Sequence, residues 1–490
     1  MKKTITLLLL IVTLKISAQT LTWNMRMNIS SNIYGNMHPR MALDASCNPM
    51  VIWGRMSDES VFFTRWNGSA FTMPVKLNPS WLTVATASWM GPDIASHGDT
   101  VYVVMKRTPE ASNLNYTYIM RSFDGGQNFS APVRIDFIAD SISRFPTVTT
   151  DATGNPVVAF MKFNSSFGAS RWAVTNSTDY GNTFSTDVKA TIGSDVCDCC
   201  PGAILSDGNM SAMLFRNNAT NIRDNWVGIS SNNSASFDNG FNVDNNNWML
   251  TSCPSSGPDG VIIDDTLYSV FMNGANVNYR AYLSKSSLHA FSANQVSNLT
   301  GNISGLSQQN YPRIATDGNA AAIVWKQVVN GNAQLPVLFT DNIRNGFPAM
   351  YDTVDLGDIT NADVAVSNGI VFVVWEDDNS GTVKYCSASF TPLNTSINEI
   401  ENNHFSVFPN PVFSDEINID LSNISNEKKE LTVSNLLGET LIHHSTNENG
   451  ILKMNIGWLS AGTYFIKLMS ADQFFVTRIV ILYIHVGFVL

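Results

Sequence analysis

The stretch CPGAILSDGNMSAMLF, Cys200 to Phe215, is one copy of a unit that decides the fold of this chain. A proline near its start is followed by a short apolar segment, a turn rich in Asp, Gly and Asn, and a second apolar segment that ends in a large side chain. Two short apolar runs around such a turn are typical of two antiparallel strands. The unit occurs seven times, beginning at His38, Gly91, Phe145, Cys200, Gly257, Tyr311 and Asn361.

The seven units recur at nearly constant intervals. Their anchor positions, a proline in six units and Ala362 in the seventh, are 39, 92, 146, 201, 258, 312 and 362, so successive anchors lie 50 to 57 residues apart. About fifty residues is the length of a four-stranded propeller blade. The sequence therefore predicts an all-β chain in which residues 22–391 form a β-propeller, with seven blades favoured over six. Thr22 to Ile29 is expected to supply the outer strand that closes the last blade.

A second motif lies downstream of the anchors. SFDGGQNF and STDYGNTF share the pattern Ser-x-Asp-x-Gly-x-x-aromatic, and four degenerate copies keep the same spacing. Asp and Ser side chains bond to the turn backbone, and Gly permits a positive φ. We therefore expect a structural role, and no catalytic one, for the residues of these turns: Ser122, Asp124, Gly126, Phe129, Ser177, Asp179, Gly181 and Phe184.

These turns are the Asp boxes of sialidase-like propellers, and residues 22–391 resemble the sialidase (BNR/Asp-box repeat) superfamily over almost their whole length. True sialidases usually have six blades, whereas the repeat here favours seven. The resemblance implies the fold. It implies little about activity, since propellers carry many unrelated functions.

The N-terminal end carries an export signal. Met1 to Ala18 has two lysines, an apolar run and a small-residue cleavage site, as in a secretory signal peptide. The apolar run is too short to cross a bilayer, so no membrane span is expected. The net charge of -11 argues against a nucleic-acid partner, which would need a basic face. Six cysteines in an exported chain favour oxidised pairs.

A second domain follows a polar linker at residues 392–403. Apolar and polar residues alternate through 404–490, which predicts a small antiparallel β-sandwich. Three motifs in order, FPNP from Phe408, LLG from Leu436 and LSAGTY from Leu459, resemble the type IX secretion C-terminal sorting domain. The resemblance implies a secreted or cell-surface protein that engages the type IX secretion machinery. Such domains usually end in a short basic stretch, whereas residues 479–490 stay apolar, so the processing of this tail is left open.

Four cysteines are expected to meet on one rim of the propeller. In the propeller family, the loop that leads into the innermost strand and the loop after the second strand open on the same face. This arrangement brings Cys197, Cys199 and Cys200 near Cys253 of the next unit. The patterns Cys-x-Cys-Cys-Pro and Cys-Pro-x-x-Gly-Pro resemble a subgroup of exported sialidase-like proteins. On the same rim, the residues expected to contact a ligand are Arg223, Asp224, Trp248 and Asp259.

The chemistry of these cysteines has three interpretations. Two disulfides are favoured in an oxidising compartment, and Cys200 is expected to pair with Cys253. A soft metal ion, Cu(I) or Zn(II), and a redox role are the alternatives; no cofactor is required. Cys47 and Cys386, in the first and last units, either pair across the closure or remain free thiols.

The position after each anchor is expected to face the central channel. Its occupants are Arg40, Asp93, Thr147, Gly202, Asp259, Arg313 and Asp363, and the ends of the second strands add Lys106, Arg216, Lys326 and Glu376. Resemblance to sialidases implies three arginines on a substrate carboxylate, for which Arg40, Arg216 and Arg313 are the candidates. It also implies a Tyr/Glu pair, which the sequence does not place.

Together these patterns predict a secreted or cell-surface propeller that binds glycan or glycoprotein. A sialidase-type, exo-acting glycoside hydrolase and a metal-binding surface protein are the alternatives.

Overall fold

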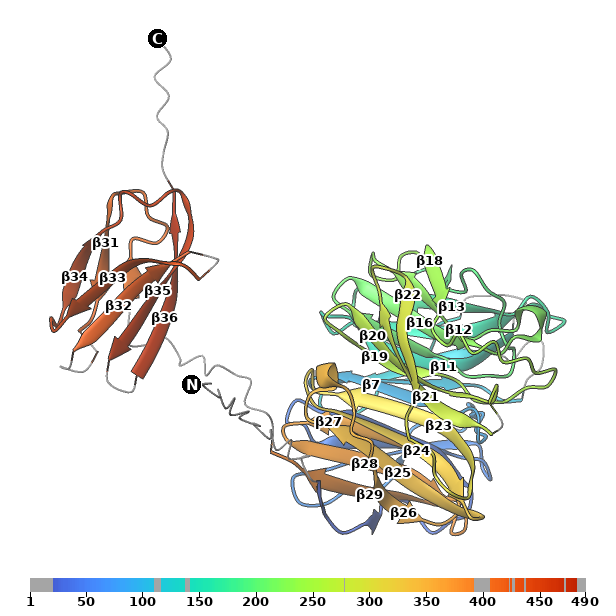
Figure 1. Ribbon diagram of the computed structural model, residues 1–490. Coiled ribbons are helices and arrows are strands. Elements are labelled where there is room, and N and C mark those ends of the chain that lie inside the picture. The colour runs from blue at the N-terminus through green and yellow to red at the C-terminus, as the bar shows by residue number, and fades with distance from the viewer. Residues whose placement is uncertain are drawn as a thin grey trace, which may run out of the picture. The chain divides into compact units, whose positions relative to one another are not determined.

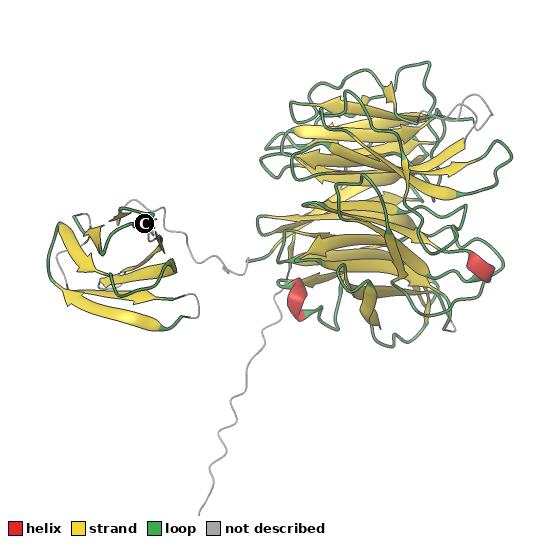
Figure 2. Ribbon diagram, turned by 90° about the horizontal axis from the view of Figure 1, so that it is seen from above, coloured by secondary structure: helices red, strands yellow, loops and turns green. Residues whose placement is uncertain are grey.

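The computed structural model describes residues 21–109, 116–136, 142–276, 278–391, 406–422, 424, 428–435, 438–470 and 473–482. The chain divides into two compact units, Met1–Leu393 and Asn394–Leu490. Strands make up nearly all the regular structure of the described residues, and two short 3-10 turns, η1 (Ala219–Asn221) and η2 (Ile343–Asn345), complete it (Figure 2). The expected signal peptide and linker lie outside the described residues.

Described residues of the first unit form seven antiparallel sheets that follow the chain in order (Figure 1). From the innermost strand outward, blade 1 contains β3 (Asn36–Leu43), β4 (Pro49–Arg55), β5 (Ser60–Arg65) and β6 (Val75–Lys76). Blade 2 contains β7 (Asp93–His97), β8 (Thr100–Lys106), β9 (Thr117–Ser122) and β10 (Val133–Arg134). Blade 3 contains β11 (Ile142–Thr150), β12 (Pro156–Phe163), β13 (Arg171–Asn176) and β14 (Val188–Lys189).

The remaining blades repeat this order. Blade 4 contains β15 (Ala203–Asp207), β16 (Met210–Arg216), β17 (Asn225–Ser230) and β18 (Asn239–Asn242). Blade 5 contains β19 (Asp259–Ile263), β20 (Thr266–Asn273), β21 (Arg280–Ser287) and β22 (Ser292–Asn298). Blade 6 contains β23 (Leu306–Thr316), β24 (Ala321–Val329), β25 (Asn332–Thr340) and β26 (Asp352–Leu356). Blade 7 contains β27 (Ile359–Ser367), β28 (Ile370–Asp377) and β29 (Thr382–Ser389).

The ring of blades is closed. Each innermost strand contacts the next one, and β27 contacts β3. The N-terminal strands β1 (Thr22–Trp23) and β2 (Met27–Asn28) pair with β29, with Thr22 opposite Ser389 and Met27 opposite Tyr385. The first and last parts of the unit thus share one sheet. The all-β class, the seven blades and the closing role of the N-terminal segment are confirmed.

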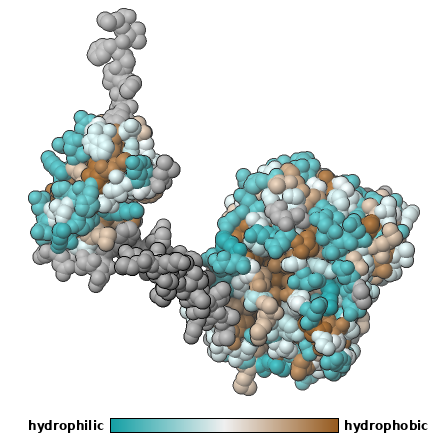
Figure 3. Space-filling view, viewed as in Figure 1, coloured by the Kyte–Doolittle hydropathy of each residue, from teal (hydrophilic) through white to brown (hydrophobic). Residues whose placement is uncertain are grey.

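The repeat supplies the core between the blades. The large residue that ends each second apolar segment is almost fully buried in every blade: Trp53, Met105, Phe160, Phe215, Phe271, Trp325 and Trp375. Burial of such large apolar side chains is the main stabilising contribution of each sheet pair. Hydrophilic residues dominate the face of the propeller shown in Figure 3, with smaller apolar patches between them.

The Asp-box turns join neighbouring blades. The main-chain N–H of Gly126 donates to the Ser122 hydroxyl at 2.9 Å, and the Asp124 carboxylate accepts the N–H groups of Gln127 and Asn128, both at 2.9 Å. Gly126 has a φ of 79°, and a Cβ there would lie 2.3 Å from the Phe63 ring of blade 1. Phe129 packs edge-on against the same ring. Ser177, Asp179 and Gly181 repeat these bonds, and a Cβ at Gly181 would lie 3.7 Å from the Phe184 ring.

The second unit is a two-sheet sandwich. One sheet has the order β30 (Ser406–Phe408), β31 (Glu416–Asp420), β34 (Ile451–Asn455). The other has the order β33 (Thr440–Thr446), β32 (Lys429–Ser434), β35 (Gly462–Ser470), β36 (Gln473–Ile481). Fully buried aliphatic side chains form its core, among them Val412, Ile417, Leu431, Ile466 and Ile479.

Two of the three sorting motifs have visible structural roles. The Asn410 side chain of FPNP donates to the Arg478 carbonyl and accepts the Val480 N–H, which ties the motif to β36. The Tyr464 hydroxyl of LSAGTY donates to the Ser460 carbonyl at 2.9 Å and closes that turn. Leu436, Leu437 and residues 483–490 lie outside the described residues. No helix in the described parts of the chain is long and apolar enough to span a membrane.

Candidate functional site

Several innermost strands carry a bulge at the anchor. The register of β3 shifts between Met37 and Arg40, and equivalent shifts occur in β11, β23 and β27. In three of these strands the residue before the proline has a left-handed backbone: His38 at a φ of 56°, Phe145 at 52° and Tyr311 at 51°. Non-glycine residues in this conformation are strained, and such strain clusters at functional sites. All three residues line one pocket.

This pocket lies where the innermost strands begin, and we call it the channel mouth. Its apolar wall consists of Trp89, Met90, Phe145, Tyr311 and anchor prolines. Its polar lining includes His38, Arg40, Asp93, Arg313 and Asn361. Ligand sites are typically concave and apolar, with a few convergent polar groups, and the channel mouth has that composition.

Arg40 and Arg313 lie close together but have different partners. Arg313 contacts Asp363 at 3.0 Å and Asp259 at 3.3 Å. Burial lowers the pKa of Arg313, but these carboxylates raise it by more than burial lowers it, so the net shift is upward. Arg40 donates only to the Pro39 carbonyl at 2.8 Å and pairs with His38 Nε2 at 2.9 Å, and it has no carboxylate partner among the described residues. Burial and the charge of Arg313 lower the pKa of Arg40, and the charges of Asp363, Asp93 and Asp259 offset this only in part.

The acidic residues after the anchors connect neighbouring blades. Asp93 accepts the main-chain N–H of Val148 in blade 3 at 3.0 Å. Asp259 accepts that of Ile314 in blade 6 at 3.0 Å, and Asp363 accepts that of Met41 in blade 1 at 2.9 Å. In each case the donor lies two residues after the anchor of the next blade. Asp259, expected on the ligand rim, therefore lies in the channel wall, where it also binds Arg313.

Arg216 does not join the other two arginines. Its side chain is 1% exposed, and it donates to the carbonyls of Ser256, Arg223 and Met272 at 2.6 to 2.8 Å. It is not among the residues that line the channel mouth. Of the three arginines expected to bind a substrate carboxylate, Arg40 and Arg313 therefore line the channel mouth and Arg216 does not, because its guanidinium holds main-chain carbonyls of blades 4 and 5.

Burial also corrects the expected ligand rim. Arg223 and Trp248 are 5% exposed and Asp224 is fully buried. Asp224 accepts the main-chain N–H groups of Asn247 and Trp248, both at 2.9 Å, and so holds the loop before blade 5 in place. These three residues brace the loop that carries Cys253, and their side chains are buried instead of exposed on the rim.

Two residues at the channel mouth were not singled out from the sequence. Trp89 lies at the tip of a tight turn closed by two main-chain bonds between Ala87 and Met90, and its side chain is 43% exposed. The Asn361 side chain donates to the Ser88 carbonyl at 2.8 Å and so holds this turn. The sequence offered little indication of the role of Trp89, because this residue lies in an irregular stretch between blades 1 and 2.

Glu376 holds the main chain of one strained residue, His38, and of Asn361 in the last blade. Its carboxylate accepts the main-chain N–H groups of His38 at 2.5 Å and Asn361 at 3.1 Å. Burial raises the pKa of Glu376 to about 7. Burial and the charges of Arg40 and Arg313 hold the pKa of His38 well below its usual value, so the imidazole is neutral beside Arg40. Burial and the charge of Glu376 raise the pKa of Tyr311.

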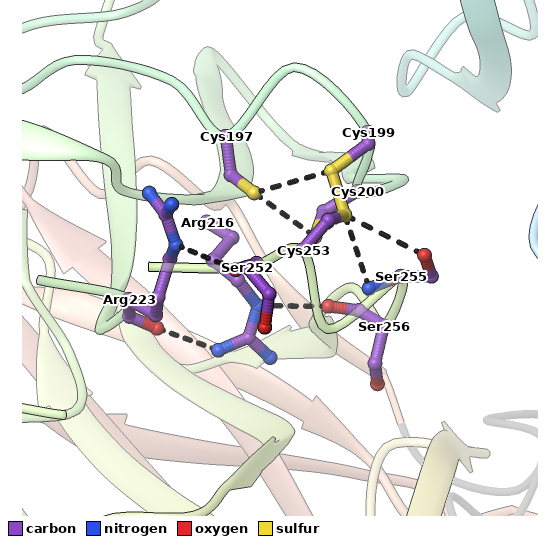
Figure 4. The surroundings of a disulfide bond; sticks show 9 residues. All are labelled: Cys197, Cys199, Cys200, Arg216, Arg223, Ser252, Cys253, Ser255 and Ser256. Atoms are coloured by element: carbon purple, nitrogen blue, oxygen red, sulfur yellow. Dashed lines mark hydrogen bonds between the residues drawn. A yellow bond between two sulfur atoms is a disulfide. The ribbon is translucent and has the colours of Figure 1, made fainter. Parts of the chain in front are cut away.

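The four cysteines of the rim come together (Figure 4). Cys199 and Cys253 form a disulfide, which corrects the expected pairing of Cys200 with Cys253. The Cys200 thiol donates to the Cys197 sulphur at 3.3 Å, and Cys200 Sγ lies 3.9 Å from Cys253 Sγ. The Cys200 thiol and the nearby arginines lower the pKa of Cys197 to about 7, and burial raises that of Cys200.

Cys47 and Cys386 are both free. The Cys47 sulphur accepts the Ser367 hydroxyl at 3.0 Å, and the Cys386 thiol donates to the Asn24 carbonyl at 3.2 Å. Cys47 and Cys386 were expected either to pair with each other or to remain free thiols, and in the structure they are free thiols.

Comparison with solved structures gives distant likenesses. The chain is similar to a Trypanosoma rangeli sialidase in complex with the inhibitor DANA, at 11% identity, with 91% of this chain and 84% of that chain covered and a TM-score of 0.42. It is similar to the Fusarium graminearum α-L-arabinofuranosidase Arb93A at 11% identity, with 67% and 98% covered and a TM-score of 0.42. A Dyadobacter fermentans protein of unknown function has 10% identity, with 76% and 99% covered and a TM-score of 0.44.

No curated protein matches the chain. A family model does match its C-terminal unit: residues 406–482 match the model described as "Secretion system C-terminal sorting domain". The match covers the sandwich and both of the described sorting motifs. The C-terminal unit is therefore a sorting domain of the type IX secretion system, and the protein is secreted or attached to the outer cell surface.

Proposed function

We propose that the propeller binds a glycan, free or on a glycoprotein, at the channel mouth. The observation that carries this proposal is Arg40, a guanidinium without a carboxylate partner among the described residues, next to the aromatic side chains of Trp89 and Tyr311. Sugar hydroxyls and carboxylates accept hydrogen bonds from arginine, and the apolar face of a sugar ring packs on aromatic rings.

The surroundings of Arg40 support a preorganised site. Glu376 and Asn361 hold the strained main chain of His38 and the Trp89 turn in place before any ligand arrives. Neutral His38 orients the guanidinium without adding a second positive charge. A site that needs little rearrangement loses little conformational entropy on binding.

A glycan array tests this proposal directly. The mature protein would be applied to neutral, uronate-containing, sulfated and sialylated oligosaccharides, and the strongest binder would be measured by calorimetry. Binding that is lost in both Arg40→Ala and Trp89→Ala supports the channel mouth as the site. Absence of binding to any class, or binding that both variants retain, contradicts it.

Hydrolysis of such a glycan is a second proposal, favoured by the electrostatic interaction between Tyr311 and Glu376 beside the two arginines. A Tyr nucleophile would need its phenol deprotonated, whereas burial and the Glu376 charge raise the pKa of Tyr311. This opposition ranks binding above hydrolysis. Turnover of fluorogenic sialosides that disappears in Tyr311→Phe, with binding retained, would favour the hydrolase.

A further inference from the structure

The four rim cysteines have the geometry of a ligand set. Each offers one sulphur, and all four sulphur atoms lie within 4.8 Å of one another. Three sulphur–sulphur separations are 3.3, 3.7 and 3.9 Å. With metal–sulphur bonds of about 2.3 Å, the sulphur atoms of a tetrahedral site lie about 3.8 Å apart. We propose that the four cysteines of the reduced chain form a tetrathiolate site for one thiophilic metal ion, Zn(II) or Cu(I).

A main-chain N–H group points at one of the four sulphur atoms, as a thiolate ligand requires. The Ser255 N–H donates to the Cys253 sulphur at 3.3 Å. Hydrogen bonds from such outer groups orient metal ligands and tune the bound ion. A thiolate gains more from them than a disulfide sulphur, because its charge strengthens each bond.

Two arginines lie beside the cluster and balance its charge. Four thiolates around a divalent ion carry a net charge of about minus two. Arg216 donates to three main-chain carbonyls, one of them that of Ser256, three residues after Cys253, so its charge is held near the cluster. Arg223 is 5% exposed, and its Nη1 has no hydrogen-bond partner among the described residues. Figure 4 shows its guanidinium close to Cys197. An unpaired buried donor is costly, and an anionic cluster would lower that cost.

The disulfide and the metal site are alternative states of the same four residues. Cys199 and Cys253 are joined in the structure, so an ion requires their reduction. A phosphine reductant with water breaks the S–S bond, yields two thiols and becomes a phosphine oxide. Four thiols then release four protons when they bind the ion. Cys253 is the exposed member of the set, so an ion can enter from its side.

The site can be tested on the mature protein without reference to glycan binding. The chain would be reduced with phosphine under anaerobic conditions, freed of metal with a chelator, and titrated separately with Zn(II) and Cu(I). We expect one ion per chain and protection of four thiols from a thiol reagent. Comparison of the two titrations identifies the preferred ion.

Cys253→Ser should weaken binding at least tenfold, whereas Cys47→Ser, which removes a thiol outside the cluster, should leave it unchanged. Co(II) substitution of the wild-type protein adds a readout that does not depend on how the variants fold, since thiolate ligation gives a charge-transfer band. Less than one ion per chain, no such band, or equal uptake by Cys253→Ser and wild type would overturn the proposal.

Discussion

Replacing Arg40 with alanine should weaken ligand binding strongly and change stability little. The guanidinium donates to its neighbour's carbonyl at 2.8 Å and pairs with His38 Nε2 at 2.9 Å, and both partners are neutral. Its removal therefore breaks no salt bridge among the described residues, in contrast to removal of Arg313, which would break the ion pairs with Asp259 and Asp363. We expect the free energy of unfolding to fall by less than about 1 kcal/mol.

The loss of affinity follows from the hydrogen bonds that the ligand would forfeit. A hydrogen bond from a charged donor contributes about 1.5–3 kcal/mol. Since about 1.4 kcal/mol corresponds to a tenfold change in Kd, Arg40→Ala should raise Kd by roughly 10- to 150-fold.

Calorimetric titration with the strongest binder from the glycan array measures this change, and urea denaturation measures stability in parallel. Arg65→Ala is the matched control, because Arg65 lies in the same blade, two strands outward from the innermost strand, and does not line the channel mouth. An unchanged Kd in Arg40→Ala, or an equal loss in Arg65→Ala, would refute the reasoning.

Three further predictions concern the scaffold of the site. Arg216→Met should lower the free energy of unfolding by at least about 3 kcal/mol, because three buried carbonyls lose a charged donor. Urea denaturation measures this loss. A variant that loses ligand binding but keeps normal stability would contradict the prediction. Gly126→Ala should destabilise the protein, because the added Cβ would clash with the Phe63 ring. The loss should exceed that of Gly208→Ala by about 1–3 kcal/mol, since φ is also positive at Gly208 but no atom lies within 4 Å of its Cβ position. Equal melting temperatures of the two variants would argue against the clash. Glu376 has a pKa of about 7 in the folded protein, raised from 4.5. Its contribution to the free energy of unfolding is therefore complete below pH 4.5, and this contribution, about 3 kcal/mol, is lost as the pH rises through 7. Glu376→Gln removes this dependence, and a stability difference from wild type that stays constant between pH 4.5 and 8 would show that the carboxyl titrates normally.

The repeat was sufficient to predict the architecture because its signals are local. A proline, an apolar run, a turn and a large apolar residue specify two paired strands wherever they occur, and seven even spacings leave few ways to arrange seven such pairs. Trp53 and its equivalents are buried as the pattern requires, and Thr22 pairs with Ser389 as the closure requires. The sorting motifs were equally local and located the second domain.

The site was only partly predictable, because residue type does not say which partner a side chain meets. Arg40, Arg216 and Arg313 were equivalent candidates by sequence. In the fold, Arg40 lacks a carboxylate partner among the described residues, Arg313 is neutralised by two aspartates, and Arg216 holds three main-chain carbonyls. Trp89 came from an irregular loop and was placed at the channel mouth by an asparagine from blade 7.

The periodic pattern of the sequence by itself favoured seven blades and predicted the closure, and resemblance to known families added the sorting domain and the meeting of four cysteines. Only the tertiary structure decided that Cys199, and not Cys200, is joined to Cys253, and that Arg223, Asp224 and Trp248 are buried braces. The physical reason is that burial and hydrogen-bond partners depend on packing between blades about fifty residues apart in the chain, and no local pattern records that packing.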